Sequence, residues 1–165
     1  MRTIKLTQGY AALVDDADYA RCMQGETWVA KVSYFKDRTV RNVYASRCTW
    51  REGKAGHQDM HRFILGITDP AINIDHKDGS GINNQRGNLR IASHGDNMHN
   101  SRKRKDNTSG FKGVHLHSQN NNWIASLTFE GRNKHLGCFA TAKEAALAYD
   151  VAAKQLFGEF AKTNF

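Results

Sequence analysis

Short strand-like runs separated by turn residues dominate the first part of the chain. Four such runs lie at 3–6, 10–14, 28–35 and 39–46. Gln8 and Gly9 separate the first two runs and residues 36–38 separate the last two, and this order of run, turn and run is typical of β-hairpins. Residues 16–23 could form a short helix between the hairpins. No residues here have a spacing that suggests catalysis, so we expect residues 1–55 to form a β-rich scaffold.

The middle of the chain predicts a strand, a long loop, a second strand and a helix. Before these elements, residues 57–66 have apolar side chains at helical spacing and end in glycine, which indicates a short amphipathic helix. Strands are expected at 72–75 and 89–92, separated by a polar stretch rich in glycine and asparagine that must form a loop. The helix begins at Ser93, because Asp96 stands three residues later in the position of a capping box.

A basic segment with glycine, serine and asparagine, residues 101–110, is the best candidate for a domain boundary. Three strand-like runs follow it, at 112–118, 123–130 and 133–139. A helix then begins at Thr141, with Glu144 in capping-box position, and ends at Gly158. This helix carries one apolar stripe, so we expect it to pack on the three-stranded sheet.

The composition indicates a polyanionic partner. Lys and Arg number 24 against 16 Asp and Glu, which gives a net charge of +8. Nucleic acid is the commonest partner of so basic a small protein. The alternative is a basic surface that is merely solvated.

Cysteine usage and hydropathy exclude several classes of protein. Cys22, Cys48 and Cys138 are far apart and form no CxxC pair, so neither a disulfide framework nor a cysteine zinc site is indicated. We expect them to be reduced packing residues of a cytoplasmic protein. No apolar run approaches the ~20 residues that cross a membrane, and the amino terminus does not resemble a signal peptide. No membrane partner and no obligate protein partner are expected.

A cluster of polar residues surrounds the predicted loop. Asp75 and His76 end the first strand, Asn88 precedes the second strand, and Asn97 lies in the first turns of the helix. A hairpin folded against a helix can bring Asp75 and Asn97 together, and two such oxygen ligands suit Mg²⁺ or Mn²⁺ better than Zn²⁺. His76 points to the other side of the strand and can face a water molecule. Taken singly, the aspartate and the asparagines are also ordinary turn residues.

These groups match the requirements of phosphodiester hydrolysis. The reaction needs an activated water and a cation that neutralises the developing negative charge. A neutral His76 can take a proton near pH 7. An ion held by Asp75 and Asn97 can supply the cation.

The same stretch resembles the HNH family of nucleases in its runs MHRFILG, IDHKDGSGINNQRGNLR and GDNMHN. The resemblance implies a ββα-metal fold, also called a His-Me finger. It implies His76 as the general base and Asp75 and Asn97 as ligands of one Mg²⁺ or Mn²⁺ ion. Asn88 takes the middle catalytic position and holds the loop that aims the histidine. Asp75 and Asn97 replace the metal-binding histidines of colicin-like members, as in phage homing endonucleases.

Two further positions bear on this resemblance. His61 and Arg62 match the HR pair that precedes the motif in the family, and we interpret His61 as structural or phosphate-contacting. The zinc-binding cysteines of some relatives are absent, so packing alone must hold the site together.

The carboxyl-terminal part resembles the plant ethylene-response-factor (Apetala-type) DNA-binding domain. The resemblance covers residues 110–165 and is carried by the runs KGV and LGCFATAKEAALAYDVAAKQLFGEFAKTNF. It implies a three-stranded sheet that lies in the DNA major groove with the helix packed behind it. His115, His117 and Gln119 depart from the arginines and the tryptophan of plant members, which leaves the base preference open.

Alternation along the three strands divides their side chains between two faces. Apolar residues expected to pack on the helix are Val114, Leu116, Trp123, Ala125, Leu127 and Leu136. Hydrogen-bonding residues expected to read the groove are His115, His117, Ser126, Thr128, Asn133 and His135. Basic residues expected to bind DNA, mainly through phosphates, are Arg102, Lys103, Arg104, Lys105, Lys112, Arg132 and Lys134. A sheet face that is merely solvated would look similar.

The sequence therefore predicts an α+β protein in four parts. These are a β-rich scaffold (1–55), an HNH nuclease centre (56–101), a basic linker (102–109) and a DNA-binding domain with a three-stranded antiparallel sheet packed on one helix (110–165). We expect a DNA endonuclease of the homing-endonuclease type, acting on double-stranded DNA in the cytoplasm, that of a bacterial host if the gene is phage-borne.

Two other functions are compatible with parts of the sequence. One is a non-catalytic, sequence-specific DNA-binding regulator in which the HNH segment is only structural. The other is an RNA-directed protein, although the sheet lacks the exposed aromatic pair of common single-strand RNA modules.

Overall fold

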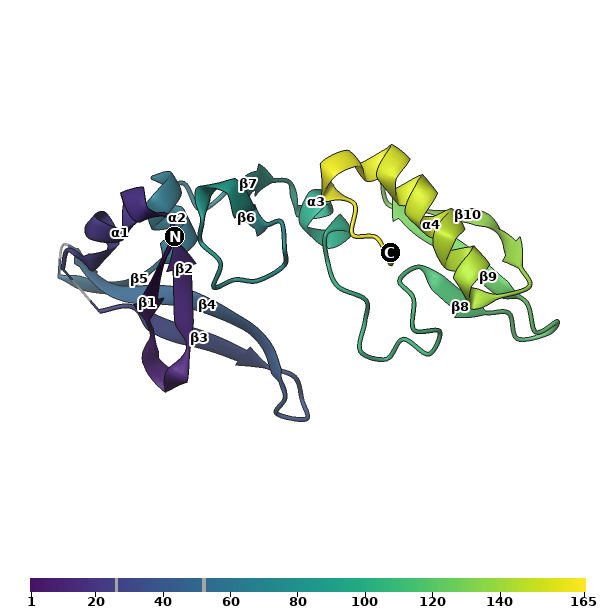
Figure 1. Cartoon of the computed structure of the whole chain (residues 1–165), viewed down its shortest axis with the longest axis horizontal. Helices are drawn as coiled ribbons and strands as arrows, with labels where there is room; N and C mark the ends of the chain where they lie inside the picture. Colours follow the sequence, from purple (N-terminus) through teal and green to yellow (C-terminus); the bar gives the residue numbers. More distant parts are fainter. Residues whose placement is uncertain (26, 52) are drawn as a thin grey trace. The chain divides into compact units, whose positions relative to one another are not determined.

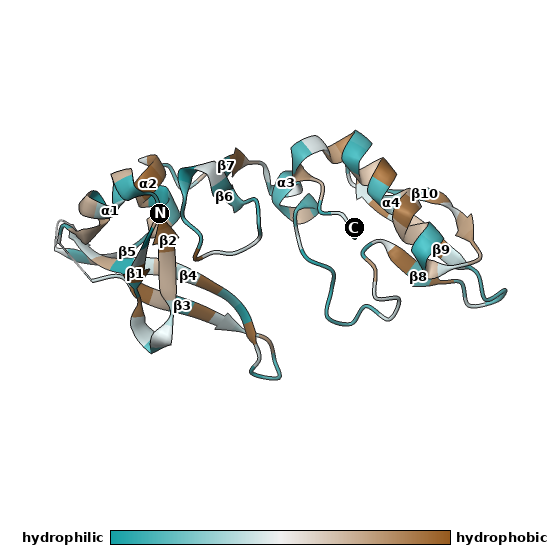
Figure 2. Ribbon diagram, in the orientation of Figure 1, coloured by the Kyte–Doolittle hydropathy of each residue, from teal (hydrophilic) through white to brown (hydrophobic). Residues whose placement is uncertain are grey.

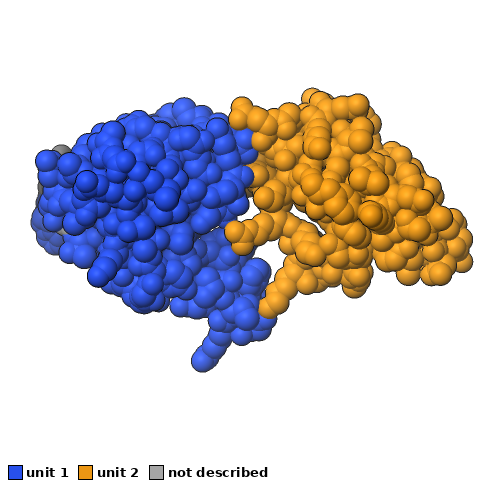
Figure 3. Space-filling model, in the orientation of Figure 1, with its two compact units in different colours: residues 1–93 blue, residues 94–165 orange. Residues whose placement is uncertain are grey.

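The computed structural model describes residues 1–25, 27–51 and 53–165. Internal contacts divide the chain into two compact units, Met1–Ser93 and His94–Phe165 (Figure 3). Among the described residues, no helix is long and apolar enough to cross a membrane.

The first unit begins with the predicted hairpin and helix. β1 (Arg2–Lys5) and β2 (Ala11–Val14) pair antiparallel (Figure 1). Between them Gln8 and Gly9 have positive φ angles of 60° and 77°, a left-handed backbone that glycine adopts without steric cost. α1 (Asp16–Met23) follows β2 after one residue.

A three-stranded antiparallel sheet follows. It contains β3 (Val29–Tyr34), β4 (Val40–Arg51) and β5 (Lys54–Asp59), with β4 in the centre (Figure 1). The predicted hairpin is confirmed, but the helix predicted over 57–66 begins too early. The helix is α2 (Met60–Leu65), whereas the three residues before it pair with β4. Residues 57–59 form backbone hydrogen bonds with β4, and these bonds would be lost if the helix began earlier. The boundary predicted after residue 55 falls inside β5.

The first unit has its own hydrophobic core. Its buried members are Ile4, Leu6, Ala12, Val14, Cys22, Trp28, Ala30, Ala45, Met60, Ile64 and Leu89. The Trp28 indole Nε1 donates a hydrogen bond to the Cys22 carbonyl at 2.8 Å, and the Arg47 guanidinium lies 4.9 Å above the Trp28 ring. The prediction that the cysteines are packing residues is right for Cys22 and wrong for Cys48 and Cys138, which are exposed.

The strands predicted at 72–75 and 89–92 complete the first unit. β6 (Asn73–His76) and β7 (Leu89–Ala92) pair antiparallel, and a short 3-10 turn, Arg86–Asn88, leads into β7. α3 (His94–His99) comes next in the chain. The predicted order of strand, long loop, strand and helix is thus confirmed.

The second unit has the predicted sheet and helix. β8 (Val114–Leu116), β9 (Trp123–Phe129) and β10 (Arg132–Phe139) are antiparallel with β9 in the centre. α4 (Ala142–Phe157) packs on this sheet, and hydrophobic turns alternate with hydrophilic ones along it (Figure 2). The predicted capping box is present, because the Thr141 hydroxyl accepts from the Glu144 backbone while the Glu144 carboxylate accepts from the Thr141 backbone.

Side-chain burial in the second unit agrees with the predicted faces at most positions. Val114, Ala125 and Leu127 are buried, and Trp123 and Leu136 are half-buried. The exception is Leu116, which is 45% exposed, so its prediction as a helix-packing residue is wrong. β8 has only three residues and Leu116 is the last of them.

The division between the units differs from the predicted linker at 102–109. α3 was expected to belong with the nuclease centre, but its contacts place it in the second unit. The His99 ring stacks on Phe157 with centroids 3.6 Å apart, and the Lys112 ammonium donates to the His99 carbonyl. These contacts explain why the division falls before α3 and not after it.

Candidate functional site

Asp75 and His76 stand side by side at the end of β6, and the pleat of the strand directs them to opposite faces. Asp75 is paired with Arg90 of β7, whose Nε and Nη2 atoms donate to Asp75 Oδ2 at 2.9 and 2.7 Å. Both side chains are largely buried. A buried carboxylate held in this way has a fixed orientation, which a ligand for a cation requires.

His76 lies against two other rings. Its imidazole is 5.2 Å from that of His61, edge to face, and 5.9 Å from the Tyr44 ring. Only 6% of His76 is exposed, so the side chain that was expected to face a water molecule is largely buried. Burial lowers the pKa of His76, and neighbouring Asn84 and Asp78 only partly oppose this effect. His76 is therefore neutral near pH 7 and able to accept a proton.

His61 of α2 shares this environment. Burial, together with the nearby His76, lowers the pKa of His61 from 6.5 to about 4. The His61 Nδ1 atom is buried without a hydrogen-bond partner, and the Tyr44 ring lies 6.0 Å away, edge-on. His61 thus packs beside the predicted base, which supports the structural interpretation of the HR pair.

Asn88 holds the loop that follows His76. Its Oδ1 accepts from the Asp78 backbone at 3.1 Å, and its Nδ2 donates to Asp78 Oδ1 at 3.0 Å and to the Asn83 carbonyl at 2.8 Å. The Asn88 carbonyl also accepts from the Lys77 backbone. One amide side chain therefore ties both ends of the loop to its middle.

The first helix and hairpin anchor the same loop, which sequence reasoning missed. Asp15 accepts from the Arg86 backbone at 2.8 Å, and Asp18, 3% exposed, accepts from the Arg86 guanidinium at 2.7 and 2.9 Å. The backbone of Leu13 exchanges hydrogen bonds with Ile82 and Asn84. No local pattern in the sequence predicts contacts between residues roughly seventy positions apart. The available signal was the pair of acidic residues, Asp15 and Asp18, near the start of the predicted helix, which can pair with a basic residue such as Arg86. The β-rich scaffold therefore supports the candidate site.

The fourth predicted residue, Asn97, is half-buried on α3. It belongs to the second unit, whereas Asp75, His76 and Asn88 belong to the first. The structure thus brings three of the four residues together on one hairpin and its loop.

Several residues that were predicted to read DNA lie on one face of the sheet in the second unit. His135 lies directly opposite Ser126, and Asn133 directly opposite Thr128. His115 lies opposite Ile124, which in turn lies opposite Cys138, so the same face also carries two residues that the sequence did not single out. Ile124 and Cys138 add an apolar side chain and a thiol to a surface of hydrogen-bonding groups, the mixture that base edges and thymine methyl groups require.

The basic residues are divided between two places. Arg132 and Lys134 pair with Phe129 and Leu127 on the other side of β10, and both are exposed. The exposed side chains from Arg102 to Arg104 border a hollow of about 930 Å³ that also reaches Ser126, Thr128 and Asn133. A basic hollow that opens onto the reading face suits a phosphate backbone.

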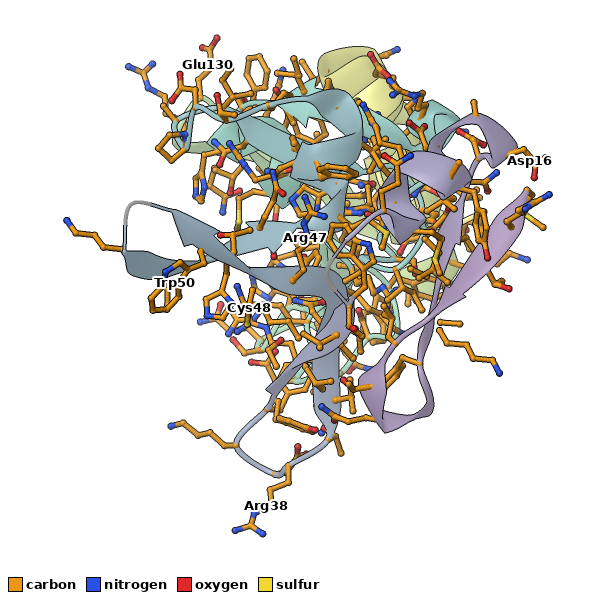
Figure 4. All side chains as sticks on the ribbon, turned by 90° about the vertical axis from the view of Figure 1, so that its left-hand side faces the viewer. Asp16, Arg38, Arg47, Cys48, Trp50 and Glu130 are labelled. Atoms are coloured by element: carbon orange, nitrogen blue, oxygen red, sulfur yellow. The ribbon has the colours of Figure 1, made fainter. Side chains whose placement is uncertain are left out.

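The face of β4 that bears Tyr44 continues outward from the candidate base. Alternation places Cys48 and Trp50 on this face, and Figure 4 shows both on the outer part of the strand, with Arg38 at the tip of the β3–β4 hairpin. Trp50 is 71% exposed. This face is thus exposed in its outer part at Cys48 and Trp50, whereas Ser46, which lies nearer to Tyr44, is buried.

Comparisons with known proteins agree with these features, although no family model matches the chain. The chain is 34% identical over 132 residues to an uncharacterized HNH endonuclease of Acanthamoeba polyphaga mimivirus, covering 72% of this chain and 68% of that protein. It is 33% identical over 89 residues to protein 3.8 of Escherichia phage T7, covering 54% of this chain and 73% of that protein.

A third relative matches the other predicted family. The chain is 48% identical over 66 residues to the ethylene-responsive transcription factor ERF084 of Arabidopsis thaliana, covering 39% of this chain and only 25% of that protein. Fold, site and relatives define a nuclease-type or DNA-binding protein. The chain belongs to the HNH endonuclease family, and its second predicted resemblance, to ethylene-response factors, is confirmed.

Proposed function

We propose that this protein is a DNA endonuclease of the homing-endonuclease type that hydrolyses phosphodiester bonds with His76 as the general base. The observation that carries the proposal is the environment of His76. It is an imidazole kept neutral by burial, at the end of a strand, beside a fixed carboxylate and ahead of a loop tied by Asn88. In this arrangement His76 takes a proton from the attacking water near neutral pH.

One Mg²⁺ or Mn²⁺ ion is proposed to bind Asp75 and Asn97. The donors fit such an ion, because a carboxylate and an amide are hard oxygen ligands and no thiolate is nearby in the motif. The position of Asn97 in the HNH motif, GDNMHN, supports its role. Bound there, the ion would supply positive charge to the phosphate that is being cleaved.

The second unit is proposed to target the nuclease to double-stranded DNA. The residues proposed to read the groove are His115, His117, Ser126, Thr128, Asn133 and His135. Those proposed to bind phosphates are Arg102, Lys103, Arg104, Lys105, Arg132 and Lys134. Most of these residues are exposed, with His117 and Ser126 half-buried, and the net charge of +8 also supports this assignment. The relative from phage T7 supports action in the cytoplasm of a bacterial host.

One observation favours a second function, a non-catalytic DNA-binding regulator. Arg90 already neutralises the Asp75 carboxylate, so an ion has to share Asp75 with a buried guanidinium. A segment that needed no metal would keep this ion pair for structural reasons alone.

Single-turnover cleavage of DNA distinguishes the two functions. EDTA should abolish cleavage and Mg²⁺ should restore it, while His76→Ala should lower the rate by ~10²–10⁴-fold with unchanged DNA affinity. Asp75→Ala should weaken metal binding, so that raising Mg²⁺ partly rescues this variant but not His76→Ala. The matched control is His57→Ala, an exposed histidine on β5, which should cleave as wild type. Cleavage by His76→Ala within a few-fold of the control would show that His76 is not the base.

A further inference from the structure

Lys112 does not extend into solvent as a phosphate-binding lysine would. Its side chain is half-buried, and Nζ donates to the carbonyl oxygens of His99 at 2.5 Å and Ser101 at 2.7 Å. His99 is the last residue of α3. The final carbonyls of a helix lack partners within the helix and carry partial negative charge, so a lysine ammonium stabilises this end.

Lys112 is itself fixed to the helix of the DNA-binding domain. Its backbone N–H donates to Asn164 Oδ1 at 2.7 Å, and Asn164 Nδ2 donates back to the Lys112 carbonyl at 3.2 Å. Asn164 also donates to the buried Asp150 carboxylate of α4 at 2.8 and 2.9 Å. A continuous hydrogen-bonded path thus runs from α4 through Asn164 and Lys112 to α3.

A second contact joins the same two helices. The His99 ring lies parallel to that of Phe157, 10° from coplanar with centroids 3.6 Å apart. Phe157 is the last residue of α4 and is buried. α3 is therefore held at its carboxyl end both by stacking and by hydrogen bonds.

We propose that Lys112 and Phe157 are positioning residues that fix α3, the helix carrying Asn97, to the DNA-binding domain. The position of a nuclease element then depends on the folded domain that reads DNA, and Lys112 is not one of the phosphate contacts. The proposal rests on the proposed function for the role of Asn97 as a ligand and for DNA reading by the second unit, whereas the contacts that fix α3 depend on neither. The low pKa of Lys112, brought to about 8 by burial with Lys162 nearby, supports an ammonium that is withdrawn from solvent.

Two readouts that need no cleavage test this proposal on the full chain. The first is hydrogen exchange of the amides at the end of α3, compared with amides of β9. The second is the salt dependence of affinity for double-stranded DNA, in which loss of one phosphate contact lowers the slope by about 1. Lys112→Met should accelerate exchange in α3 by about tenfold, as expected for loss of hydrogen bonds to a charged group, with β9 and the salt slope unchanged.

Three further variants complete the test. Lys112→Arg should retain protection of α3, because a guanidinium also donates to carbonyl oxygens. Phe157→Leu keeps an apolar side chain but removes the stacking partner of His99. It should accelerate exchange more in α3 than in β9, because Phe157 also packs on Leu127 and Phe129 of β9. The matched control is Lys134→Met, which removes an exposed positive charge from the same unit and should lower the salt slope without affecting α3.

The results that overturn the proposal are distinct from failure of the nuclease function. A lower salt slope for Lys112→Met with unchanged exchange in α3 would identify Lys112 as a phosphate contact. Equal acceleration in α3 and β9 would show that these residues support the whole domain and not α3 in particular. A protein without any nuclease activity can still give the expected result. Where cleavage is observed, Lys112→Met should need more Mg²⁺ for half-maximal rate at unchanged DNA affinity.

Discussion

His61 and His76 occupy a site in which an imidazolium is unfavourable. Their rings are in contact and Tyr44 lies against both. Removing water from around a charged ring raises its free energy, and protonation of one histidine opposes protonation of the other. At the scale of single residues, packing thus selects the neutral form that a general base needs.

This burial predicts that acid destabilises the first unit. The pKa of His61 is near 4 in the folded chain and near 6.5 when unfolded, so the unfolded state binds more protons between these values. The stability that His61 contributes is present above pH 6.5 and is lost as pH falls toward 4. Urea unfolding measured from pH 7.5 to 4.5 should therefore show a smaller loss of unfolding free energy for His61→Phe than for wild type, because phenylalanine keeps a ring but cannot titrate. His57→Phe, at an exposed position, should follow wild type, and identical losses in all three proteins would contradict the prediction.

At the scale of elements, local patterns in the sequence predicted most strands and helices of both units. The hairpin turn at Gln8 and Gly9 and the capping box of α4 are signals contained within a few residues. β5 was missed because residues 57–59 carry no strong alternation and their partner strand lies elsewhere in the chain. The anchoring of Arg86 by Asp18 was missed for the same reason, since no local pattern encodes a contact between distant segments.

The candidate site shows the same limit. The motif identified Asp75, His76 and Asn88, because these residues lie on one short hairpin and its loop. The sequence also assigned Lys112 to phosphate binding, because Lys112 is a basic residue of the segment that resembles ethylene-response factors. Which partner a lysine finds depends on the packing of the surrounding elements. Here the ammonium of Lys112 donates to the carbonyls of His99, the last residue of α3, and of Ser101 just after it.

The start of β8 provides a test at the element scale. Gly113 and Gly131 both have φ near +74°, but a Cβ on Gly113 would lie 2.0 Å from the Tyr149 ring, whereas one on Gly131 would meet nothing within 4 Å. Gly131→Ala should cost about 1 kcal/mol, the cost of a left-handed backbone. Gly113→Ala should cost a further ~1–3 kcal/mol or more from overpacking. Urea unfolding of the two variants measures this difference, and equal costs would show that β8 and α4 are not packed this closely.

At the scale of the whole molecule, each unit has a core of its own. The buried cluster around Trp28 and Met60 draws only on the first unit, and the clusters around Ala125 and Tyr149 draw only on the second. Separate cores are the usual condition for separate folding.

Two fragments test this division. Residues 94–165 should fold alone and bind double-stranded DNA with the salt slope of the full chain, because they contain the reading face and the basic segment. Residues 1–93 should fold but should not cleave DNA, since they lack Asn97. Circular dichroism, DNA titrations and cleavage assays measure these properties. A fragment 94–165 without cooperative unfolding, or cleavage by fragment 1–93, would contradict the prediction.

The attachment of α3 to α4 has a consequence for how such genes can be recombined. In a chimera joined within the basic segment at 102–109, His99 and Phe157 would come from different parent proteins. The end of α3 would then pack against a domain with which it did not evolve. A junction between Ser93 and His94 keeps the stacked rings of His99 and Phe157, and the hydrogen bond from Lys112 to the His99 carbonyl, within one parent sequence. Exchange of DNA specificity among these nucleases is therefore expected to carry the last helix of the HNH motif along with the reading domain, so that motif and target preference are inherited together.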